Sequence, residues 1–365
     1  MTIRVLTDAI HADLLESLHL TREDRLGYEL YVPHGLDWYE AGIWRFEHAR
    51  LGDAVARQFL QPWHDDIPPD GAWDDGSRQS SNPGWWVRRD TTHPGRTIRR
   101  LTLEQAADLK PDLIISTLAE NDLGLAKFAR EVGAHFGVQI GNQGQGSAWG
   151  AAEFALLSST TPGFTAWMPH VYYHQEFDTA RLFDAETERA LPDRVGTWVQ
   201  CATTTSGYDR FRSLAARTGL DWRWYGHCGE PDEFHGGNMP STPEVAARMH
   251  EARIAWHWKE WSDGYGHVIH NLAAIGRPLL VTSRYYQDKL AGPLLIEGVT
   301  SWDIRAHTDD ELVRIISRLV SDDDHWRRVC EDTAARFREI VSFDEEAEAI
   351  REMLENVLSD RLVTA

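Results

Sequence analysis

The turn between residues 259 and 266 holds the residues best suited to binding a charged ligand. A strand-like run, RIAWHW, leads into it, and a helix-like run, YGHVIHNLAAIG, leads out of it. Gly264 and Gly266 let the backbone approach a ligand closely, and the unpaired amides and positive dipole end of a helix N-terminus attract phosphate groups. We therefore predict a phosphate or sugar-phosphate site at the start of this helix, with Lys259 as an additional positive charge.

A second set of candidates follows the first strand-like run, IRVLT at 3–7. His11 and Asp13 come shortly after it, where an imidazole or a carboxylate could take the proton from an acceptor hydroxyl group. Asp13 is the preferred general base for a reaction that inverts configuration. Because polar residues at the start of a helix also serve as caps, a structural role is the alternative.

The stretch WWVRRDTTHPGRTIRR, residues 85–100, departs from the acidic character of the chain. It contains five arginines and one aspartate, a net charge of +4. Arginines interleaved with tryptophans suit a nucleic-acid backbone and an unstacked base. The candidate acceptor-binding residues are Trp85, Trp86, Arg88, Arg89 and Arg99. A solubilising surface loop is the alternative.

Strand-like and helix-like runs alternate along the chain, a pattern typical of parallel sheets with helices on both faces. DLIIST and HFGVQI are continuous apolar runs typical of buried strands. A fresh count begins with RVGTWVQCAT and continues through YDRFRSLAART and DWRWYGHCG. We predict an α/β fold of two Rossmann-like, doubly wound domains facing a cleft. The predicted boundaries are 1–165 for the N-terminal domain, 166–191 for a crossover, 192–342 for the C-terminal domain and 343–365 for an acidic amphipathic helix.

Composition excludes several classes of protein. The chain has 365 residues, of which 42% are hydrophobic and 26% charged, and this favours a globular protein of two domains. No apolar run reaches the roughly 18 residues that span a bilayer, and the start lacks a signal-peptide pattern, so we expect a cytoplasmic protein without a membrane partner. The net charge of −20 argues against nonspecific binding to DNA over the whole surface.

Metal and dinucleotide chemistry find little support in the sequence. The three cysteines form no CxxC motif. His267 and His270 lack further ligands in any recognisable pattern, and no DxD motif is evident, so we predict that no metal or other cofactor is required. The glycines of GNQGQG at 141–146 stand at the wrong offsets for a dinucleotide fingerprint. An NAD-dependent oxidoreductase is therefore the last of the functions considered.

The order of turn, helix, Gly-x-Pro and strand from Asp263 onward resembles the donor-binding segment of GT-B glycosyltransferases. In that family Glu-Gly-Phe-Gly precedes a helix that carries a second glutamate. The matching positions here are Asp263, Gly264, Tyr265, Gly266 and, for the second glutamate, Asn271. The resemblance implies that the residues at the turn contact the sugar of a UDP- or GDP-sugar donor and that Asn271 faces its ribose. It also implies that the C-terminal helix packs back on the first, acceptor-side domain.

Other loops of the second domain are expected at the same edge of the sheet. Thr204 and Thr205 follow its first strand, where they and Arg210 could meet phosphate oxygens. Tyr225, Gly226 and His227 lie where this fold places the nucleobase. Turn and cap roles are the alternatives for these residues.

The runs EDRLGYELYVPHGLDWYEAGIW, GDAVARQFL and VYYHQEFD resemble a group of bacteriophage-encoded glycosyltransferases. Some of these attach sugars to hydroxymethylated pyrimidines of phage DNA and others to virion proteins. Together with the arginine stretch, the resemblance predicts sugar transfer from a nucleotide-sugar to a 5-hydroxymethylpyrimidine base in the cytoplasm of a bacterial host. The alternatives are transfer to a virion protein or a small molecule, a nucleotide-sugar epimerase or hydrolase, and a non-catalytic carbohydrate-binding protein, which the 16 tryptophans would suit.

Overall fold

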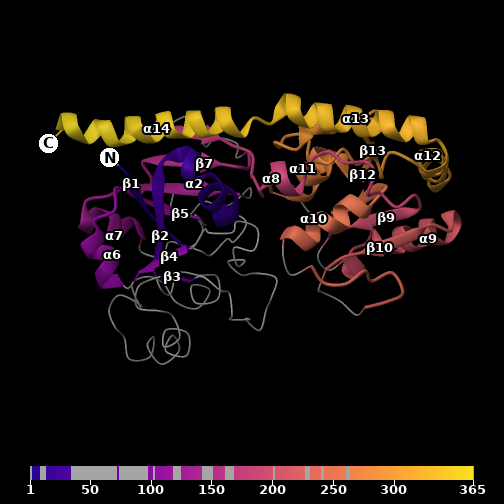
Figure 1. Ribbon diagram of the computed structural model, residues 1–365, viewed down its shortest axis with the longest axis horizontal. Coiled ribbons are helices and arrows are strands. Elements are labelled where there is room, and N and C mark those ends of the chain that lie inside the picture. Colours follow the sequence, from indigo (N-terminus) through magenta and orange to yellow (C-terminus); the bar gives the residue numbers. More distant parts are fainter. Residues whose placement is uncertain are drawn as a thin grey trace. The chain divides into compact units, whose positions relative to one another are not determined.

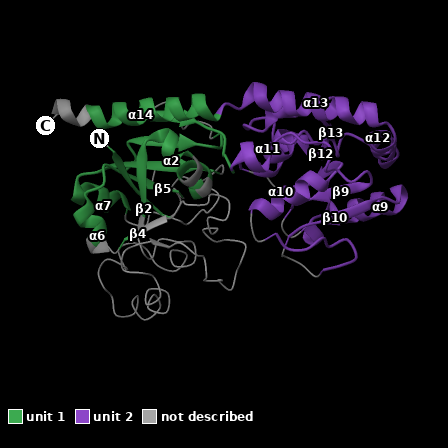
Figure 2. Ribbon diagram, in the orientation of Figure 1, with its two compact units in different colours: residues 1–177, 343–365 green, residues 178–342 purple. Residues whose placement is uncertain are grey.

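The computed structural model describes most of the chain in two compact units. The described residues are 2–8, 14–33, 72–73, 98–101, 103–117, 125–141, 151–160, 168–199, 202–226, 231–239, 242–259 and 264–364. Unit 1 comprises residues 1–177 and 343–365, and unit 2 comprises residues 178–342 (Figure 2). The predicted crossover is thus divided between the units. Among the described residues, no helix is both long and apolar enough to cross a membrane.

Unit 1 contains a sheet of eight strands in the part of the chain that the structure describes. The strands are β1 (Ile3–Thr7), β2 (Tyr28–Pro33), β3 (Ala72–Trp73), β4 (Ile98–Leu101), β5 (Leu113–Ser116), β6 (His135–Ile140), β7 (Phe154–Leu157) and β8 (His170–Tyr172). Their order is β3-β4-β2-β1-β5-β6-β7-β8, and all neighbours pair in parallel except β3 with β4. The run β4-β2-β1-β5-β6-β7 within this order matches the 3-2-1-4-5-6 strand order of a Rossmann sheet, with β4 in the place of the third strand.

Apolar clusters cover both faces of the unit 1 sheet. Successive residues of a strand point to opposite faces, so neighbouring residues of β1 show what covers each one. On β1, Leu6 joins the apolar cluster formed with α6 (Leu103–Leu109) and α7 (Leu125–Val132). Its neighbour Val5 joins the cluster on the other face, which includes a π-helical segment at Leu15–Leu20. Unit 1 is therefore doubly wound, as the sequence predicts.

The last helix of the described chain, α14 (Phe343–Thr364; yellow in Figure 1), belongs to unit 1 (Figure 2). Its residues Ile350 and Leu354 are 0% and 1% exposed and pack into the same cluster as Val5. Burying such side chains contributes roughly 1.5–3 kcal/mol each. The helix thus completes one face of the unit 1 core.

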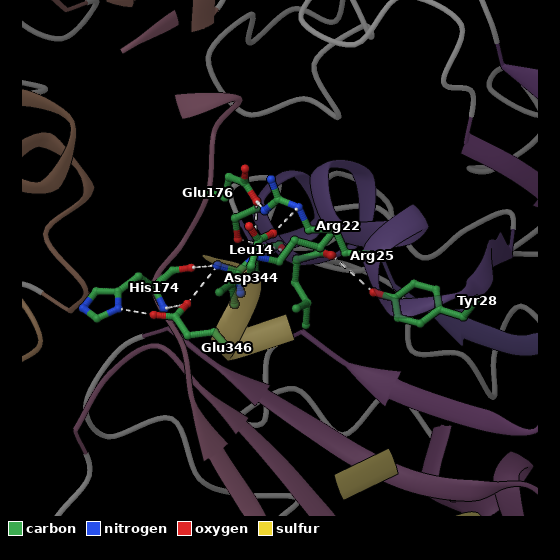
Figure 3. Close-up of polar contacts among 10 residues, drawn as sticks. Leu14, Arg22, Arg25, Tyr28, His174, Glu176, Asp344 and Glu346 are labelled. Atoms are coloured by element: carbon green, nitrogen blue, oxygen red, sulfur yellow. Dashed lines mark hydrogen bonds and ion pairs between the residues drawn. The ribbon is translucent and has the colours of Figure 1, made fainter. Parts of the chain in front are cut away.

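A buried polar network fastens α14 to the rest of unit 1 (Figure 3). Arg22, on α2 (Thr21–Leu26), is fully buried and makes ion pairs with Glu176 at 3.3 Å and with Glu346 of α14 at 2.8 Å. The other carboxylate oxygen of Glu346 lies 2.5 Å from His174 Nδ1. The two carboxylates therefore balance the buried guanidinium charge, which would be costly to bury alone.

Unit 2 contains a five-stranded, all-parallel sheet in the described part of the chain. The strands are β9 (Arg194–Thr197), β10 (Asp221–Trp224), β11 (Ile254–His257), β12 (Leu279–Val281) and β13 (Ser301–Asp303), in the order β10-β9-β11-β12-β13. His235 forms an isolated parallel bridge to Trp224 of β10. The bridge stands where the third strand of a Rossmann sheet would lie, so unit 2 has the same strand order as unit 1, with that strand reduced to a single pairing.

The tryptophans of unit 2 are largely core residues. Trp222, Trp224 and Trp256 are 1%, 0% and 2% exposed, and Phe211 packs edge-on against Trp222 with ring centroids 4.9 Å apart. They form one cluster with side chains from three helices, α9 (Tyr208–Thr218), α12 (Asp309–Ser321) and α13 (Asp323–Ile340). The tryptophan content of the chain therefore builds a core here, which weakens it as an argument for a carbohydrate-binding protein.

Candidate functional site

The carboxyl ends of β9 and β11 lie side by side in unit 2, since these two strands pair directly. After β9 the chain passes through α9 to β10 on one side of this point. After β11 it passes through α11 (His267–Ala274) to β12 on the other side. Open α/β sheets bind ligands at such a topological switch point. The turn at 259–266 follows one of the two strands that define it.

The start of α11 depends on a glycine. Gly266 is the N-cap residue with φ +79°, and a Cβ atom there would lie 2.9 Å from Tyr286 Cε1. The Tyr265 ring is 4% exposed and stacks on the ring of His270 at 3.9 Å, while His270 Nδ1 lies 3.1 Å from the Gly266 carbonyl oxygen. Side-chain packing therefore fixes the backbone at the positive dipole end of the helix. The buried Tyr265 ring is part of this packing, through its stacking on His270.

Two buried residues help to hold the turn at 259–266 in place. Sequence reasoning did not single them out. His257, the last residue of β11, and Tyr286, in the loop after β12, are both 0% exposed, and His257 Nε2 lies 2.9 Å from the Tyr286 hydroxyl. Lys259 is half-buried, and its amide donates to Thr282 Oγ1 at 3.4 Å. The only sequence signal for this support is a histidine that ends an apolar strand-like run.

A small pocket, with room for about one water molecule, lies beside the switch point. Its lining comes from β9, the segment after it, α9 and β11: Thr197, Val199, Ala202, Thr205, Gly207, Tyr208, Phe211, Trp256 and Trp258. Trp258 packs flat against Gly207, where a Cβ atom would lie 2.2 Å from the indole ring. The pocket therefore has an aromatic wall and one hydroxyl-bearing loop.

The residues predicted to meet phosphate oxygens, on and after the loop that follows β9, have different roles in the structure. Thr205 lines the pocket, although its hydroxyl also donates to the Ala202 carbonyl at 2.9 Å, and Thr204 ends the short 3-10 helix at Ala202–Thr204. Arg210 donates to Asp309 Oδ1 at 2.7 Å and to the His307 carbonyl oxygen at 2.6 Å. Its guanidinium group therefore links α9 to the start of α12. This is a contact within the protein, whereas the sequence predicts a contact with phosphate oxygens.

Tyr225 is a core residue in the structure. Its ring is 3% exposed and stacks on Trp198 at 5.5 Å, and its hydroxyl accepts from Arg194 Nη1 at 3.0 Å. Burial raises its pKa above the usual range. At Gly226 the amide donates to the Gly237 carbonyl at 3.3 Å, and the carbonyl accepts from His235 Nε2 at 2.9 Å. The Tyr225 ring is thus committed to packing, and a nucleobase contact there would have to come from other groups.

The remaining predicted residues divide into placed and undescribed ones. Asn271 lies within α11 and is 5% exposed. Arg99 lies on β4, where its backbone is in register with Tyr31 and Ala72. The predicted residues outside the described part of the chain are His11, Asp13, Trp85, Trp86, Arg88, Arg89, His227 and Asp263.

Within the described ranges, no group of three or more histidine, cysteine, aspartate or glutamate side chains could hold a metal ion.

Known proteins resemble this chain in structure but not in sequence. No protein-family model matches the chain, and no curated protein matches it in sequence. The structure of Anabaena HepE in complex with UDP superposes with a TM-score of 0.58 at 12% identity, covering 98% of this chain and 100% of HepE. Sucrose-phosphate synthase from Thermosynechococcus elongatus gives 0.57 at 10% identity, covering 99% and 100%. The chain therefore has the two-domain α/β fold of the GT-B type.

Proposed function

We propose that the protein is a glycosyltransferase that uses a nucleotide-sugar, with a UDP-sugar as the first donor to test. The observation that carries the proposal is the start of α11: a glycine N-cap with φ +79°, held over the buried pair His257 and Tyr286, at the switch point of the unit 2 sheet. A helix N-terminus in this position suits a diphosphate. The HepE structures with UDP, with UDP and glucose, and with UDP-glucose support the choice of donor.

The proposed reaction breaks the bond between the anomeric carbon of the sugar and the diphosphate oxygen. A bond forms from that carbon to an acceptor oxygen. The acceptor's proton passes to an enzyme base if configuration is inverted, or to the departing diphosphate if it is retained. Negative charge develops on the departing diphosphate, where the dipole of α11 and the ammonium group of Lys259 would stabilise it. Unit 2 is the donor side in this scheme and unit 1 the acceptor side, with Asp13 or His11 as the base if configuration is inverted.

Donor turnover gives the direct test. We expect nucleoside diphosphate release from one member of a panel of UDP-, GDP- and ADP-sugars. Lys259→Ala should lower turnover about a hundredfold, the scale seen when a stabilising group is removed from a developing charge. Lys127→Ala, which changes an exposed lysine of α7, is the matched control. Release that is equal in both variants would remove Lys259 from the site, and absence of release with every donor would favour a binding protein.

For the acceptor we propose a hydroxymethylated pyrimidine in DNA, supported by the charge of +4 in residues 85–100. Both substrates of this reaction are found in the bacterial cytoplasm, which is where we place it. Release that depends on DNA containing 5-hydroxymethylcytosine or 5-hydroxymethyluracil is the expected result. A triple alanine variant of Arg88, Arg89 and Arg99 should abolish that dependence. Release that proceeds without such DNA would instead favour a virion protein or a small molecule as acceptor.

A further inference from the structure

Two arginines and two aromatic residues meet where three neighbouring strands of unit 2 end. Trp258 follows β11, Arg284 and Tyr285 follow β12, and Arg305 follows β13. These strands are adjacent and parallel, so their carboxyl ends lie along one edge of the sheet, the edge of the switch point. We refer to the four residues as the arginine–aromatic cluster. Sequence reasoning had singled out none of them.

Aromatic faces hold both guanidinium groups of the cluster. The Arg305 guanidinium carbon lies 4.7 Å from the centre of the Trp258 ring and 5.3 Å from that of Tyr285. The Arg284 guanidinium carbon lies 4.8 Å from the same Tyr285 ring, and its Nη2 donates to the Tyr285 hydroxyl at 2.9 Å. Cation–π contacts of this kind orient a guanidinium plane while leaving its edge donors available.

Two acidic side chains on these loops, Asp303 and Glu297, bind other groups. Asp303 accepts from Ser283 Oγ at 2.6 Å and from the Arg305 amide at 2.8 Å. Glu297 accepts from the Asp303 amide at 2.9 Å and lies 2.8 Å from His307 Nε2. Asp303 thus links the loop after β12 to the loop after β13 through two neutral donors, the Ser283 hydroxyl and the Arg305 amide.

The exposed arginines of unit 2 differ in whether a described carboxylate pairs with them. The chain has 57 acidic residues against 37 basic ones. In the described part of the chain, no carboxylate lies within ion-pair distance of Arg284 or Arg305, although both are exposed. In the same unit, Arg217 and Arg248 have such partners, whereas the exposed Arg212 and Arg314 have none among the described residues. What distinguishes Arg284 and Arg305 is that aromatic faces hold their guanidinium groups. Two oriented guanidinium groups left without a carboxylate are a suitable arrangement for an external oxyanion.

We propose that the arginine–aromatic cluster is an oxyanion subsite that binds a phosphate or carboxylate group of a substrate held at the switch point. The inference rests on the proposed function for the identity of that substrate. Two sources share this chemistry. One is the diphosphate of the nucleotide-sugar, and the other is an acidic group on the transferred sugar, as in a uronic acid.

Titration calorimetry of the full chain distinguishes the sources. The ligands are uridine, UDP, UDP-glucose, UDP-glucuronic acid and inorganic pyrophosphate. The test variant is the double substitution Arg284→Gln and Arg305→Gln. The matched control is Arg217→Gln, which changes an exposed arginine in the last turn of α9. Loss of charge-assisted hydrogen bonds should weaken binding of the affected ligand about tenfold or more. Arg305→Lys keeps the charge but loses the planar stacking on Trp258, so it should recover only part of the affinity.

Weaker binding of UDP and pyrophosphate with unchanged uridine supports the subsite and identifies the diphosphate as its ligand. Weaker binding of UDP-glucuronic acid alone supports the subsite and identifies a sugar carboxylate. Binding of all five ligands at wild-type affinity by the double variant overturns the subsite. If wild-type protein binds pyrophosphate through these arginines but no nucleotide, the proposed function fails while the subsite stands.

Discussion

At the scale of single residues, Gly266 is the position where a substitution tells most about the site. Its φ of +79° is a conformation that favours glycine, and an added Cβ atom would press on the Tyr286 ring. We expect Gly266→Ala to lower the free energy of unfolding by about 2 kcal/mol or more and to weaken donor binding, because the start of α11 must shift. Urea denaturation and calorimetry with UDP measure the two effects.

Gly219 provides the control for that substitution. It has φ +64°, ends α9, and has open space where a Cβ atom would go. Gly219→Ala should therefore cost only the backbone strain, about 1 kcal/mol, and leave UDP affinity unchanged. Equal effects of the two substitutions on UDP binding would show that the start of α11 is not part of the donor site.

The sequence identified the turn at the start of α11 but not the roles of the side chains around it. Glycines, a strand and a helix in order are a local pattern, and the structure places them at the switch point. By contrast, Arg210 and Tyr225 are held by Asp309 and Arg194, which lie 99 and 31 residues away along the chain. The local spacing of residues cannot indicate partners so far apart along the chain.

At the scale of elements, the attachment of α14 to unit 1 should depend on pH. Burial tends to raise the pKa of Glu346, but hydrogen bonds from His174 and Arg22 outweigh it, and the pKa lies below its usual value. A carboxylate with a lowered folded-state pKa stabilises the fold above its unfolded-state pKa, and that stability is lost as pH falls through the folded-state value. Glu346→Gln should thus cost about 2 kcal/mol at pH 7.

The pH dependence separates this contact from simple packing. The difference in unfolding free energy between wild type and Glu346→Gln should shrink below about pH 4, as the wild-type carboxyl group becomes protonated. Glu352→Gln, on an exposed position of the same helix, should change stability little at any pH. A Glu346→Gln cost that stays constant down to pH 3 would argue that the charge is irrelevant to the attachment.

Elements with a strong local pattern were predicted well, and irregular ones were not. The apolar runs of β5 and β6 and the helical run of α9 lie where the sequence indicates. After the first strand, where the sequence suggests the start of an ordinary helix, the described chain is π-helical over Leu15–Leu20. There, Gln139 Nε2 donates to the Leu14 carbonyl and the Tyr28 hydroxyl to the Leu18 carbonyl. These side chains come from other elements, so helical periodicity cannot indicate the change.

At the scale of the whole molecule, the two units should differ in their ability to fold alone. Unit 2 is one continuous segment with its own sheet and core. Unit 1 needs α14 to cover one face of its sheet. We expect residues 178–342 to melt cooperatively in calorimetry and to bind UDP, and residues 1–177 to lack a cooperative transition until a peptide of residues 343–365 is added.

A segment 1–177 that melts cooperatively, at the same temperature with and without the peptide, would show that α14 is dispensable for the unit 1 core. A shorter peptide that begins after Glu346 is a useful comparison, since it keeps Ile350 and Leu354 but lacks the carboxylate that pairs with Arg22.

The interrupted connectivity of unit 1 has a consequence for biosynthesis. At a translation rate of about 5–20 residues per second, the ribosome needs roughly 10 to 30 s to make residues 178–342 before it reaches α14. During that time unit 2 can fold, while the sheet face that carries Val5 stays uncovered. We therefore expect nascent unit 1 to expose this apolar sheet face to solvent until its closing helix emerges.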